Sequence, residues 1–306
     1  MTDPIIAVLI PCYNEEAAIA QTIAGFRSAL PGATIYVYDN NSHDRTIEIA
    51  RTAGAIVRKE PMQGKGNVVR RMFADIDADI YVLTDGDATY DAASAPRMIE
   101  LLQTECLDMV NGQRVTDITA AYRSGHRFGN ALFTRIIGLL FGSRFQDILS
   151  GYRVFSRRFV KSFPVLSTGF EIETELTVHA LELRMPAMEL PTPYKDRPEG
   201  SVSKLNTWRD GFRISWMIVK LVKKGRPLFF FGIICILLAL LSIIISIPII
   251  TTYLETGLVP RVPTAILSTG IMILSFLSLT AGLILDTVTT GRVEIKRLMY
   301  LSIRNR

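Results

Sequence analysis

Two aspartates separated by one glycine, Asp85 and Asp87, are the side chains of this sequence with the clearest chemical potential. They follow a strand-like run at 79–84 and open into a polar loop. In α/β sheets, ligands bind outside the carboxyl ends of the strands. Mg²⁺ and Mn²⁺ prefer oxygen ligands and are commonly held by one or two carboxylates together with substrate phosphates. The pattern predicts a metal-assisted site for a nucleoside diphosphate, with a solvated acidic turn as the alternative.

Strand-like and helix-like segments alternate along the N-terminal part of the chain. Strands are predicted over 5–10, 34–38, 55–58, 79–84 and 108–112, and helices over 15–30, 44–53, 64–76 and 94–104. Such alternation is typical of a mostly parallel sheet with helices on both faces. Because parallel strands end at one edge of the sheet, we expect the polar loops carrying Asn14, Glu15, Asp39 and Lys65 to meet the aspartate pair there.

Lys65 follows Gly64 at a predicted helix start, an arrangement also found in Walker phosphate-binding loops. No glycine stands five residues before Gly64, and Gly66 replaces the serine or threonine that this loop requires. The sequence therefore excludes a Walker loop. We expect Lys65 to help form a nucleotide pocket, the alternative being an exposed lysine at a helix start.

The C-terminal part carries the apolar excess of a chain with 306 residues, 49% hydrophobic content and a net charge of +5. Two uncharged stretches, 228–250 and 262–285, are long enough to span a bilayer. Basic residues lie outside both stretches, which places the N-terminal domain and the tail 287–306 in the cytoplasm by the positive-inside rule. The three cysteines share no CxxC spacing, which argues against a disulfide framework.

The two predicted spans contain no acidic or basic residue and are expected to form an anchor rather than a transport pathway. Gly270 and Gly282 would let the helices pack closely. Pro248 and Pro260 are predicted to bracket the turn between them. The basic flanks indicate anionic lipid or phosphate partners rather than nucleic acid.

A further membrane contact is predicted for the stretch 121–141, as an amphipathic helix lying on the membrane surface. Arg123 and Arg127 share a helix face by their i,i+4 spacing. Arginine suits phosphate through its forked donors. These residues and Arg144 are candidates for binding an acceptor phosphate, with attraction to lipid headgroups as the alternative.

Several segments, taken in order, resemble the family 2 inverting glycosyltransferases with a GT-A nucleotide-sugar fold. They are Pro-Cys-Tyr-Asn-Glu-Glu (11–16), Asp-Asn-Asn-Ser-His-Asp (39–44), Gly-Lys-Gly-Asn (64–67) and Asp-Gly-Asp (85–87). The segment 146–153, Gln-Asp-Ile-Leu-Ser-Gly-Tyr-Arg, and the stretch 194–205 resemble the polyprenyl-phosphate branch. With two C-terminal spans, the chain most resembles the bactoprenol glucosyltransferases, nearly from end to end.

The resemblance implies an α/β, Rossmann-like GT-A domain at 1–205, a juxtamembrane helix at 206–227, a two-helix anchor at 228–286 and the basic tail. It implies a homo-oligomer, such as a tetramer, and Mg²⁺ or Mn²⁺ at Asp87 and Asp85. The implied donor-binding residues are Pro11, Tyr13, Asn14, Glu15, Asp39, Lys65, Asp85, Gln113, Arg197 and Lys204. The implied acceptor-phosphate residues are Arg123, Arg127, Arg144 and Ser150.

Asp147 and Asp87 are the catalytic candidates that the resemblance implies. Asp147 would act as a base or orient the acceptor or sugar, and the alternative is a structural pair with Arg153 or Arg144. Arg197 and Lys204 lie in a loop that would close over the donor diphosphate, or would bind anionic lipid.

The implied reaction is transfer of a hexose from a nucleotide sugar to undecaprenyl phosphate at the cytoplasmic face of the inner membrane. The first candidate is glucose from UDP-glucose. Inversion would give a β-linked lipid-phosphate sugar. The alternatives are a GDP-mannose-dependent polyprenyl-phosphate mannose synthase and an inactive nucleotide-sugar-binding scaffold.

Overall fold

The computed structural model describes residues 3–115, 138, 145–165, 167, 169, 171–196, 219–220 and 222–303. It divides into an α/β unit, Met1–Ile214 with Lys296–Arg306, and a helical unit, Ser215–Ile295. Nearly all of the predicted surface helix 121–141 and most of the predicted helix 206–227 lie outside the described residues.

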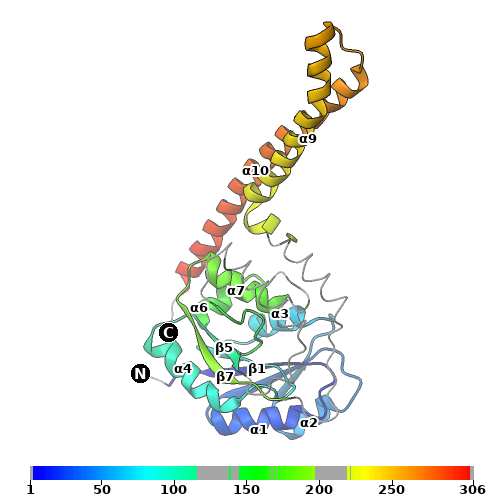
Figure 1. The fold of residues 1–306 in the computed structure, drawn as a ribbon. Coiled ribbons are helices and arrows are strands. Elements are labelled where there is room, and N and C mark those ends of the chain that lie inside the picture. The colour runs from blue at the N-terminus through cyan, green and yellow to red at the C-terminus, as the bar shows by residue number, and fades with distance from the viewer. Residues whose placement is uncertain are drawn as a thin grey trace. The chain divides into compact units, whose positions relative to one another are not determined.

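A seven-stranded sheet in the order β3-β2-β1-β4-β6-β5-β7 forms the centre of the α/β unit (Figure 1). The strands are β1 (Ile6–Cys12), β2 (Thr34–Asp39), β3 (Ile56–Lys59), β4 (Ile80–Leu83), β5 (Met109–Val115), β6 (Arg153–Ser156) and β7 (Ala187–Pro193). The helices are α1 (Ile19–Ala29), α2 (Thr46–Thr52), α3 (Lys65–Asp75), η1 (Ala92–Ser94), α4 (Ala95–Thr104), α6 (Arg157–Ser162) and α7 (Ile172–Glu182).

Strand direction decides which loops meet. The strands β3, β2, β1 and β4 are parallel to their neighbours, as are β5 and β7. Of the strands in the described part of the chain, only β6 runs antiparallel, against both β4 and β5. The amino end of β6 therefore lies at the edge where the other strands end, and this brings residues 145–152 to the same edge as the loops after β1, β2 and β4.

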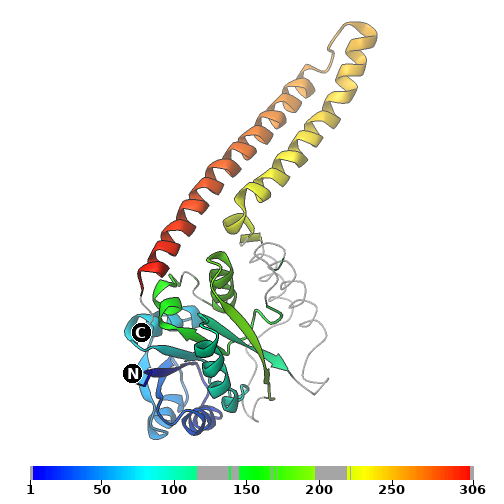
Figure 2. The ribbon, with the colours of Figure 1, turned by 90° about the vertical axis from the view of Figure 1, so that its left-hand side faces the viewer.

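Helices cover both faces of the sheet, as the two views show (Figures 1 and 2). On the face of α1 and α4, the core includes Val8, Ile23, Phe26 and Met98. On the face of α3, α6 and α7, aromatic rings pack in a cluster, with Phe155 stacked on Phe159 at 4.6 Å between centroids. Both faces of the sheet are therefore apolar, which suits strands that read as continuous hydrophobic runs.

The predicted α/β class is confirmed, with a mixed and mostly parallel sheet. Every strand and helix predicted up to residue 112 is present, although its ends differ by a few residues. The elements β6, α6, α7 and β7 were not predicted. The strand β6 is only four residues long, and its register depends on β4 and β5, which lie far away in the sequence.

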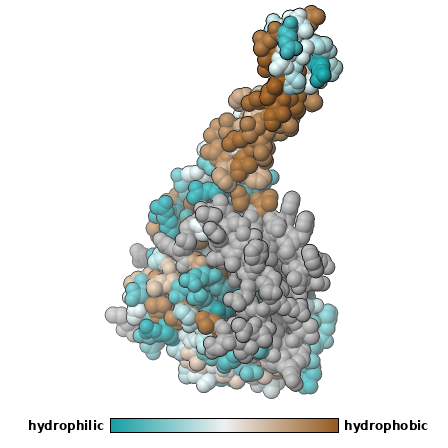
Figure 3. All heavy atoms as spheres, viewed as in Figure 1, coloured by the Kyte–Doolittle hydropathy of each residue, from teal (hydrophilic) through white to brown (hydrophobic). Residues whose placement is uncertain are grey.

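The helical unit contains α9 (Pro227–Thr256) and most of α10 (Val262–Ser302). Both helices are long and apolar enough to cross a membrane. In the most apolar 18-residue stretch of each helix, only 6% in α9 and 11% in α10 is buried within the structure. Apolar side chains cover most of the surface of this helix pair in Figure 3, and polar ones gather at the end that carries the turn. A core helix of a soluble protein would instead bury most of such an apolar stretch.

Serines and one glycine take part in the contact between α9 and α10. The hydroxyl of Ser242 donates to Ser268 O at 2.7 Å, and that of Ser275 donates to Cys235 O at 2.8 Å. A Cβ atom at Gly282 would come 3.0 Å from the Cβ of Phe231, so this glycine permits the close approach. Nothing lies within 4 Å of the corresponding position at Gly270, which does not take part in the contact.

The prediction that Pro248 brackets the turn was wrong, because α9 continues through it to Thr256. Long apolar helices tolerate proline where neighbouring groups satisfy the freed backbone atoms. Pro248 lacks the N–H that would otherwise donate to the carbonyl of Ile244, one turn earlier in the helix.

Candidate functional site

The direction of the chain across the sheet reverses between β1 and β4, which makes this the topological switch point of the sheet. After β1 the chain proceeds outward to β2 and β3, and it then returns to the opposite side of β1 to form β4. Ligands of open α/β sheets bind at such a switch point, outside the carboxyl ends of the strands. The loops that flank this point are 13–16 after β1 and 84–89 after β4.

The loop after β1 is tied to the loop after β2 by hydrogen bonds. The backbone N–H of Asn14 donates to Ser42 Oγ at 2.9 Å, and the side-chain oxygen of Asn14 accepts from the N–H of His43 at 2.8 Å. The N–H of Glu15 donates to Thr46 Oγ1 at 2.9 Å. Asn14 and Asn41 have positive φ angles of 51° and 67°, a conformation that asparagine tolerates better than most residues. These hydrogen bonds therefore hold the loops after β1 and β2 together.

Asp39, the last residue of β2, has a carboxylate oxygen without a partner. Its side chain is buried, and Oδ2 accepts from the N–H of Ser42 at 3.1 Å. Among the described residues, nothing hydrogen-bonds to Oδ1. Buried polar atoms are nearly always paired, and an exception requires an explanation. A ligand that presents an N–H or O–H group would supply the missing partner.

Asn40 joins the loop after β2 to the loop before α3. Its amide group donates to the carbonyls of Glu60 and Met62, each at 2.9 Å, and its oxygen accepts from the N–H of Gly64 at 2.7 Å. Sequence reasoning did not single out Asn40, although an amide directly after the strand-terminal Asp39 was the signal available. The contacts place the start of α3 beside the end of β2.

The aspartate pair is held against β1. A Cβ atom at Gly86 would lie 2.7 Å from Cys12 Sγ, so a larger residue would push the pair out of place. Asp87 is buried, and its Oδ1 accepts from both the N–H and the hydroxyl of Thr89, at 3.2 and 2.6 Å. Ala88 between them has a φ of 57°, a strained value for a residue with a Cβ atom.

The donor set of the aspartate pair fits a hard divalent cation that a substrate helps to hold. Asp85 and Asp87 offer carboxylate oxygens, which are the ligands that Mg²⁺ and Mn²⁺ prefer. Among the described residues, no group of three or more His, Cys, Asp and Glu side chains could hold a metal ion. Such a pair suits an ion that takes further ligands from a bound diphosphate and water.

Lys65, the first residue of α3, reaches the aspartate pair. Its ammonium group pairs with Asp85 and, at 2.5 Å, with Glu173 of α7. Burial alone would lower the pKa of Lys65, but the charges of the two carboxylates outweigh it and raise that pKa, so the lysine is cationic. Lys65 therefore lies at the predicted site, whereas Glu173 was missed, because nothing in the sequence relates residues so far apart.

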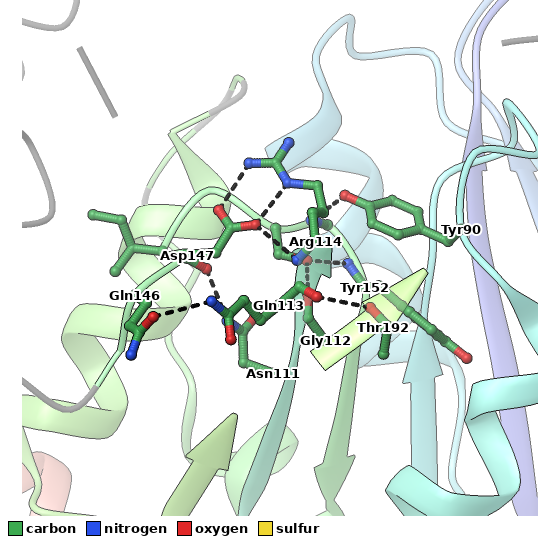
Figure 4. Close-up of polar contacts among 12 residues, drawn as sticks. Tyr90, Asn111, Gly112, Gln113, Arg114, Gln146, Asp147, Tyr152 and Thr192 are labelled. Atoms are coloured by element: carbon green, nitrogen blue, oxygen red, sulfur yellow. Dashed lines mark hydrogen bonds and ion pairs between the residues drawn. The ribbon is translucent and has the colours of Figure 1, made fainter. Parts of the chain in front are cut away.

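The side chain of Asp147 faces that of Arg114 in β5 (Figure 4). Arg114 Nε and Nη2 donate to the two carboxylate oxygens at 2.7 and 2.8 Å, and the N–H of Arg114 adds a bond of 3.2 Å. Burial would raise the pKa of Asp147, but the bonds to Arg114 and its charge lower it below the ordinary value. Asp147 is therefore ionised, and both of its carboxylate oxygens accept hydrogen bonds from Arg114.

The alternative prediction that Asp147 pairs with Arg153 was wrong. The guanidinium of Arg153 is fully buried and donates instead to the carbonyls of Ile148 and Ser150, at 2.8 and 3.0 Å. Burial lowers the pKa of Arg153 to about 10. Arg144 lies outside the described residues.

Glu189 of β7 holds the loop that carries Asp147. Its two carboxylate oxygens accept from the N–H groups of Gln146 and Asp147, at 2.6 and 3.0 Å. Asn111 of β5 donates from one amide nitrogen to Glu189 and to Asp147 O, both at 2.8 Å. The parallel pairing of β5 and β7 places these residues side by side, and sequence reasoning found neither.

The remaining predicted residues are distributed as follows. Pro11 lies within β1 and Tyr13 directly after it. Gln113 of β5 donates to Gln146 Oε1 at 3.1 Å. Ser150 is fully buried, and its hydroxyl donates to Gly112 O at 2.6 Å. Arg123, Arg127, Arg144, Arg197 and Lys204 lie outside the described residues.

Comparisons with known proteins identify the family of this chain. The model of the family "Glycosyl transferase family 2" matches residues 7–163. The chain is 38% identical to glycosyltransferase AglJ of Haloferax volcanii over 233 residues, or 76% of each chain. It is 31% identical to a dolichyl-phosphate hexose transferase of the same organism over 222 residues, 72% of this chain and 95% of the relative.

Solved structures show the same fold. Glucosyl-3-phosphoglycerate synthase from Mycobacterium tuberculosis, in complex with Mn²⁺, UDP and glucosyl-3-phosphoglycerate, matches with a TM-score of 0.59 at 22% identity, over 73% of this chain and 80% of that one. The family match includes Asp39, Lys65 and the aspartate pair. The chain belongs to glycosyl transferase family 2, with an α/β GT-A fold followed by two long apolar helices.

Proposed function

We propose that this glycosyltransferase moves a hexose from a UDP-sugar to undecaprenyl phosphate at the cytoplasmic face of the membrane. The first candidate donor is UDP-glucose. The observation that supports it most is the convergence of Asp39, Lys65 and the aspartate pair at the switch point. A relative named for dolichyl-phosphate hexose transfer favours a lipid phosphate acceptor. The apolar helices α9 and α10 favour a membrane location.

The donor would lie at the switch point between β1 and β4. The free oxygen of Asp39 would accept a hydrogen bond from the nucleoside, while Asp85 and Asp87 would hold the cation. When bound, Mg²⁺ or Mn²⁺ would neutralise charge on the departing diphosphate. The Mycobacterium tuberculosis synthase contains Mn²⁺ together with UDP, which supports this assignment.

The acceptor phosphate would attack directly. One of its oxygens forms a bond to the anomeric carbon while the bond from that carbon to the UDP oxygen breaks, which inverts the configuration. A phosphomonoester has a second pKa of about 6 and is largely ionised at pH 7, so it needs no general base. This agrees with Asp147, which is ionised and engaged by Arg114. Asp147 would orient the sugar or acceptor, and no covalent enzyme intermediate is needed.

Contacts to the acceptor phosphate remain proposals for Arg123, Arg127 and Arg144, and contacts to the donor diphosphate for Arg197 and Lys204. The same role for Ser150 would require its hydroxyl to leave the carbonyl of Gly112. The protein would lie in the inner membrane through α9 and α10, with its α/β unit in the cytoplasm.

A UDP-release assay tests the proposal. The full chain in detergent or liposomes is given undecaprenyl phosphate and a panel of UDP- and GDP-sugars, with and without Mn²⁺ or Mg²⁺. Asp87→Asn should abolish turnover. Asp77→Asn is the matched control, because Asp77 precedes β4, at the opposite edge of the sheet, and pairs with Arg157. It should retain the parent's turnover.

Turnover with one UDP-hexose that depends on lipid and metal supports the proposal and names the sugar. Turnover with GDP-mannose alone would replace it by a mannose synthase. Retained UDP binding without turnover on any donor would overturn the enzyme assignment for this acceptor and favour a nucleotide-sugar-binding scaffold.

A further inference from the structure

Lys65 is shared between two carboxylates that come from distant parts of the chain. Its ammonium group pairs with Asp85, beside the end of β4, and with Glu173 in the first turn of α7, at 2.5 Å. The side chains of Lys65 and Glu173 are only 10% and 7% exposed, while that of Asp85 is 29% exposed. This triplet of Asp85, Lys65 and Glu173 carries one positive and two negative charges.

The segment that follows Asp147 closes against the triplet. A Cβ atom at Gly151 would lie 2.7 Å from Asp85 Oδ2 and 3.1 Å from Lys65 Nζ. The N–H of Gly151 donates to the hydroxyl of Tyr90 at 2.8 Å, which fixes the glycine there. Any side chain at position 151 would displace the triplet. The loop before β6 and the helix α7 therefore both restrict the positions of Asp85 and Lys65.

A lysine paired with Asp85 alone would compete with a cation for that carboxylate. Together, Lys65 and Asp85 have no net charge, and the charge that attracts a divalent ion would be lost. Glu173 returns the net charge of the triplet to minus one. It also offers Lys65 a second anchor, so the lysine can stay in place when Asp85 turns one oxygen to a cation. Electrostatic effects of this kind are strong where side chains are shielded from water.

We propose that Glu173 is a positioning residue, which holds Lys65 so that Asp85 remains available to the divalent cation of the donor complex. This inference rests on the proposed function, because the cation is the one assigned there to Asp85 and Asp87. Glu173 acts through Lys65 and does not itself touch the cation. Such outer-shell partners of a metal ligand typically change metal affinity by about 10–100-fold when they are lost.

The test measures Mn²⁺ and UDP affinity of the full chain in detergent, without acceptor or turnover. Mn²⁺ binding is followed by calorimetry or electron paramagnetic resonance, and UDP binding is measured separately in EDTA. Glu173→Gln keeps the shape and removes the charge. Glu182→Gln is the matched control, since Glu182 ends the same helix in an ion pair with Lys296 at 2.6 Å. It lies about 13 Å from Glu173 along the helix axis, at about 1.5 Å per residue.

We expect Glu173→Gln to weaken Mn²⁺ binding about 10–100-fold while UDP affinity in EDTA changes less than about threefold. Glu182→Gln should leave both affinities unchanged. The double variant Lys65→Met with Glu173→Gln is the sharpest test, because Asp85 alone then restores the net charge of minus one. Its Mn²⁺ affinity should return toward that of the parent, which a purely structural role for Glu173 would not produce.

Parental Mn²⁺ affinity in Glu173→Gln would overturn the inference. So would an equal loss of Mn²⁺ and UDP binding, or a double variant that binds Mn²⁺ no better than the single one. If the parent binds no Mn²⁺, both the inference and the metal assignment fail. If the Mn²⁺ pattern is as expected but no hexose reaches the lipid, the inference stands and the proposed function fails.

Discussion

The pair of Arg114 and Asp147 gives the most quantitative prediction. Their side chains are 16% and 8% exposed, and two charged hydrogen bonds of 2.7 and 2.8 Å join them. Removing one partner of a buried ion pair leaves the other charge uncompensated and costs about 3–5 kcal/mol. Arg114→Met keeps the packing of the side-chain stem and removes the charge. Because the pair is not fully buried, we expect a loss near the lower figure, about 3 kcal/mol.

The expected loss can be read as a shift in melting temperature. For a unit of about 150–250 residues, 1 kcal/mol corresponds to about 2–4 °C, so Arg114→Met should melt about 6–12 °C lower. Asp147→Asn should cost less, since the arginine that remains is more exposed and lies over the ring of Tyr194, 5.6 Å from its centre. The double variant, in which neither charge remains, should lie within about 1 kcal/mol of Asp147→Asn.

Thermal unfolding of the full chain in mild detergent, followed by circular dichroism, measures this double-mutant cycle. A parental melting temperature for Arg114→Met, or a double variant whose loss equals the sum of the two single losses, would refute the account of a buried, coupled pair. Turnover adds a second readout. If Asp147 orients and does not take a proton, Asp147→Asn should lower kcat without changing the shape of its pH profile between pH 5.5 and 8.

Three further predictions concern other parts of the molecule. Burial lowers the pKa of His179 from 6.5 to about 3. Below pH 6.5 the unfolded chain therefore binds one proton more than the folded chain, and the free energy of unfolding decreases as the pH is lowered. At about 1.4 kcal/mol per unit, His179→Gln should reduce the stability difference between pH 7 and pH 5, measured by denaturant unfolding, by about 2 kcal/mol. Asp39→Asn should weaken UDP binding about 10–100-fold by calorimetry with the melting temperature retained, because a hydrogen bond to a charged acceptor is worth about 1.5–3 kcal/mol. Gly282→Ile should cost about 1–3 kcal/mol by forcing α9 and α10 apart, whereas the control Gly270→Ile should melt like the parent in detergent.

The local pattern of the sequence determined most of the architecture. Apolar runs separated by polar loops were sufficient for β1 to β5 and for α1 to α4, because strand and helix periods are encoded over a few residues. The positions of Asp39, Lys65 and the aspartate pair after strands predicted their convergence, since parallel strands end at one edge. The two apolar stretches identified α9 and α10 through length and composition alone.

Tertiary structure alone decided how the charged groups pair. Asp147 bonds Arg114, and Lys65 bonds Glu173, across 33 and 108 positions of sequence. These pairs depend on β6 running antiparallel between β4 and β5, and on the position of α7 over α3. No periodicity encodes a contact of that range, because the partners are chosen by strand order and packing rather than by spacing along the chain. The sequence thus determined which residues reach the edge of the sheet, and the fold determined which charge each of them meets there.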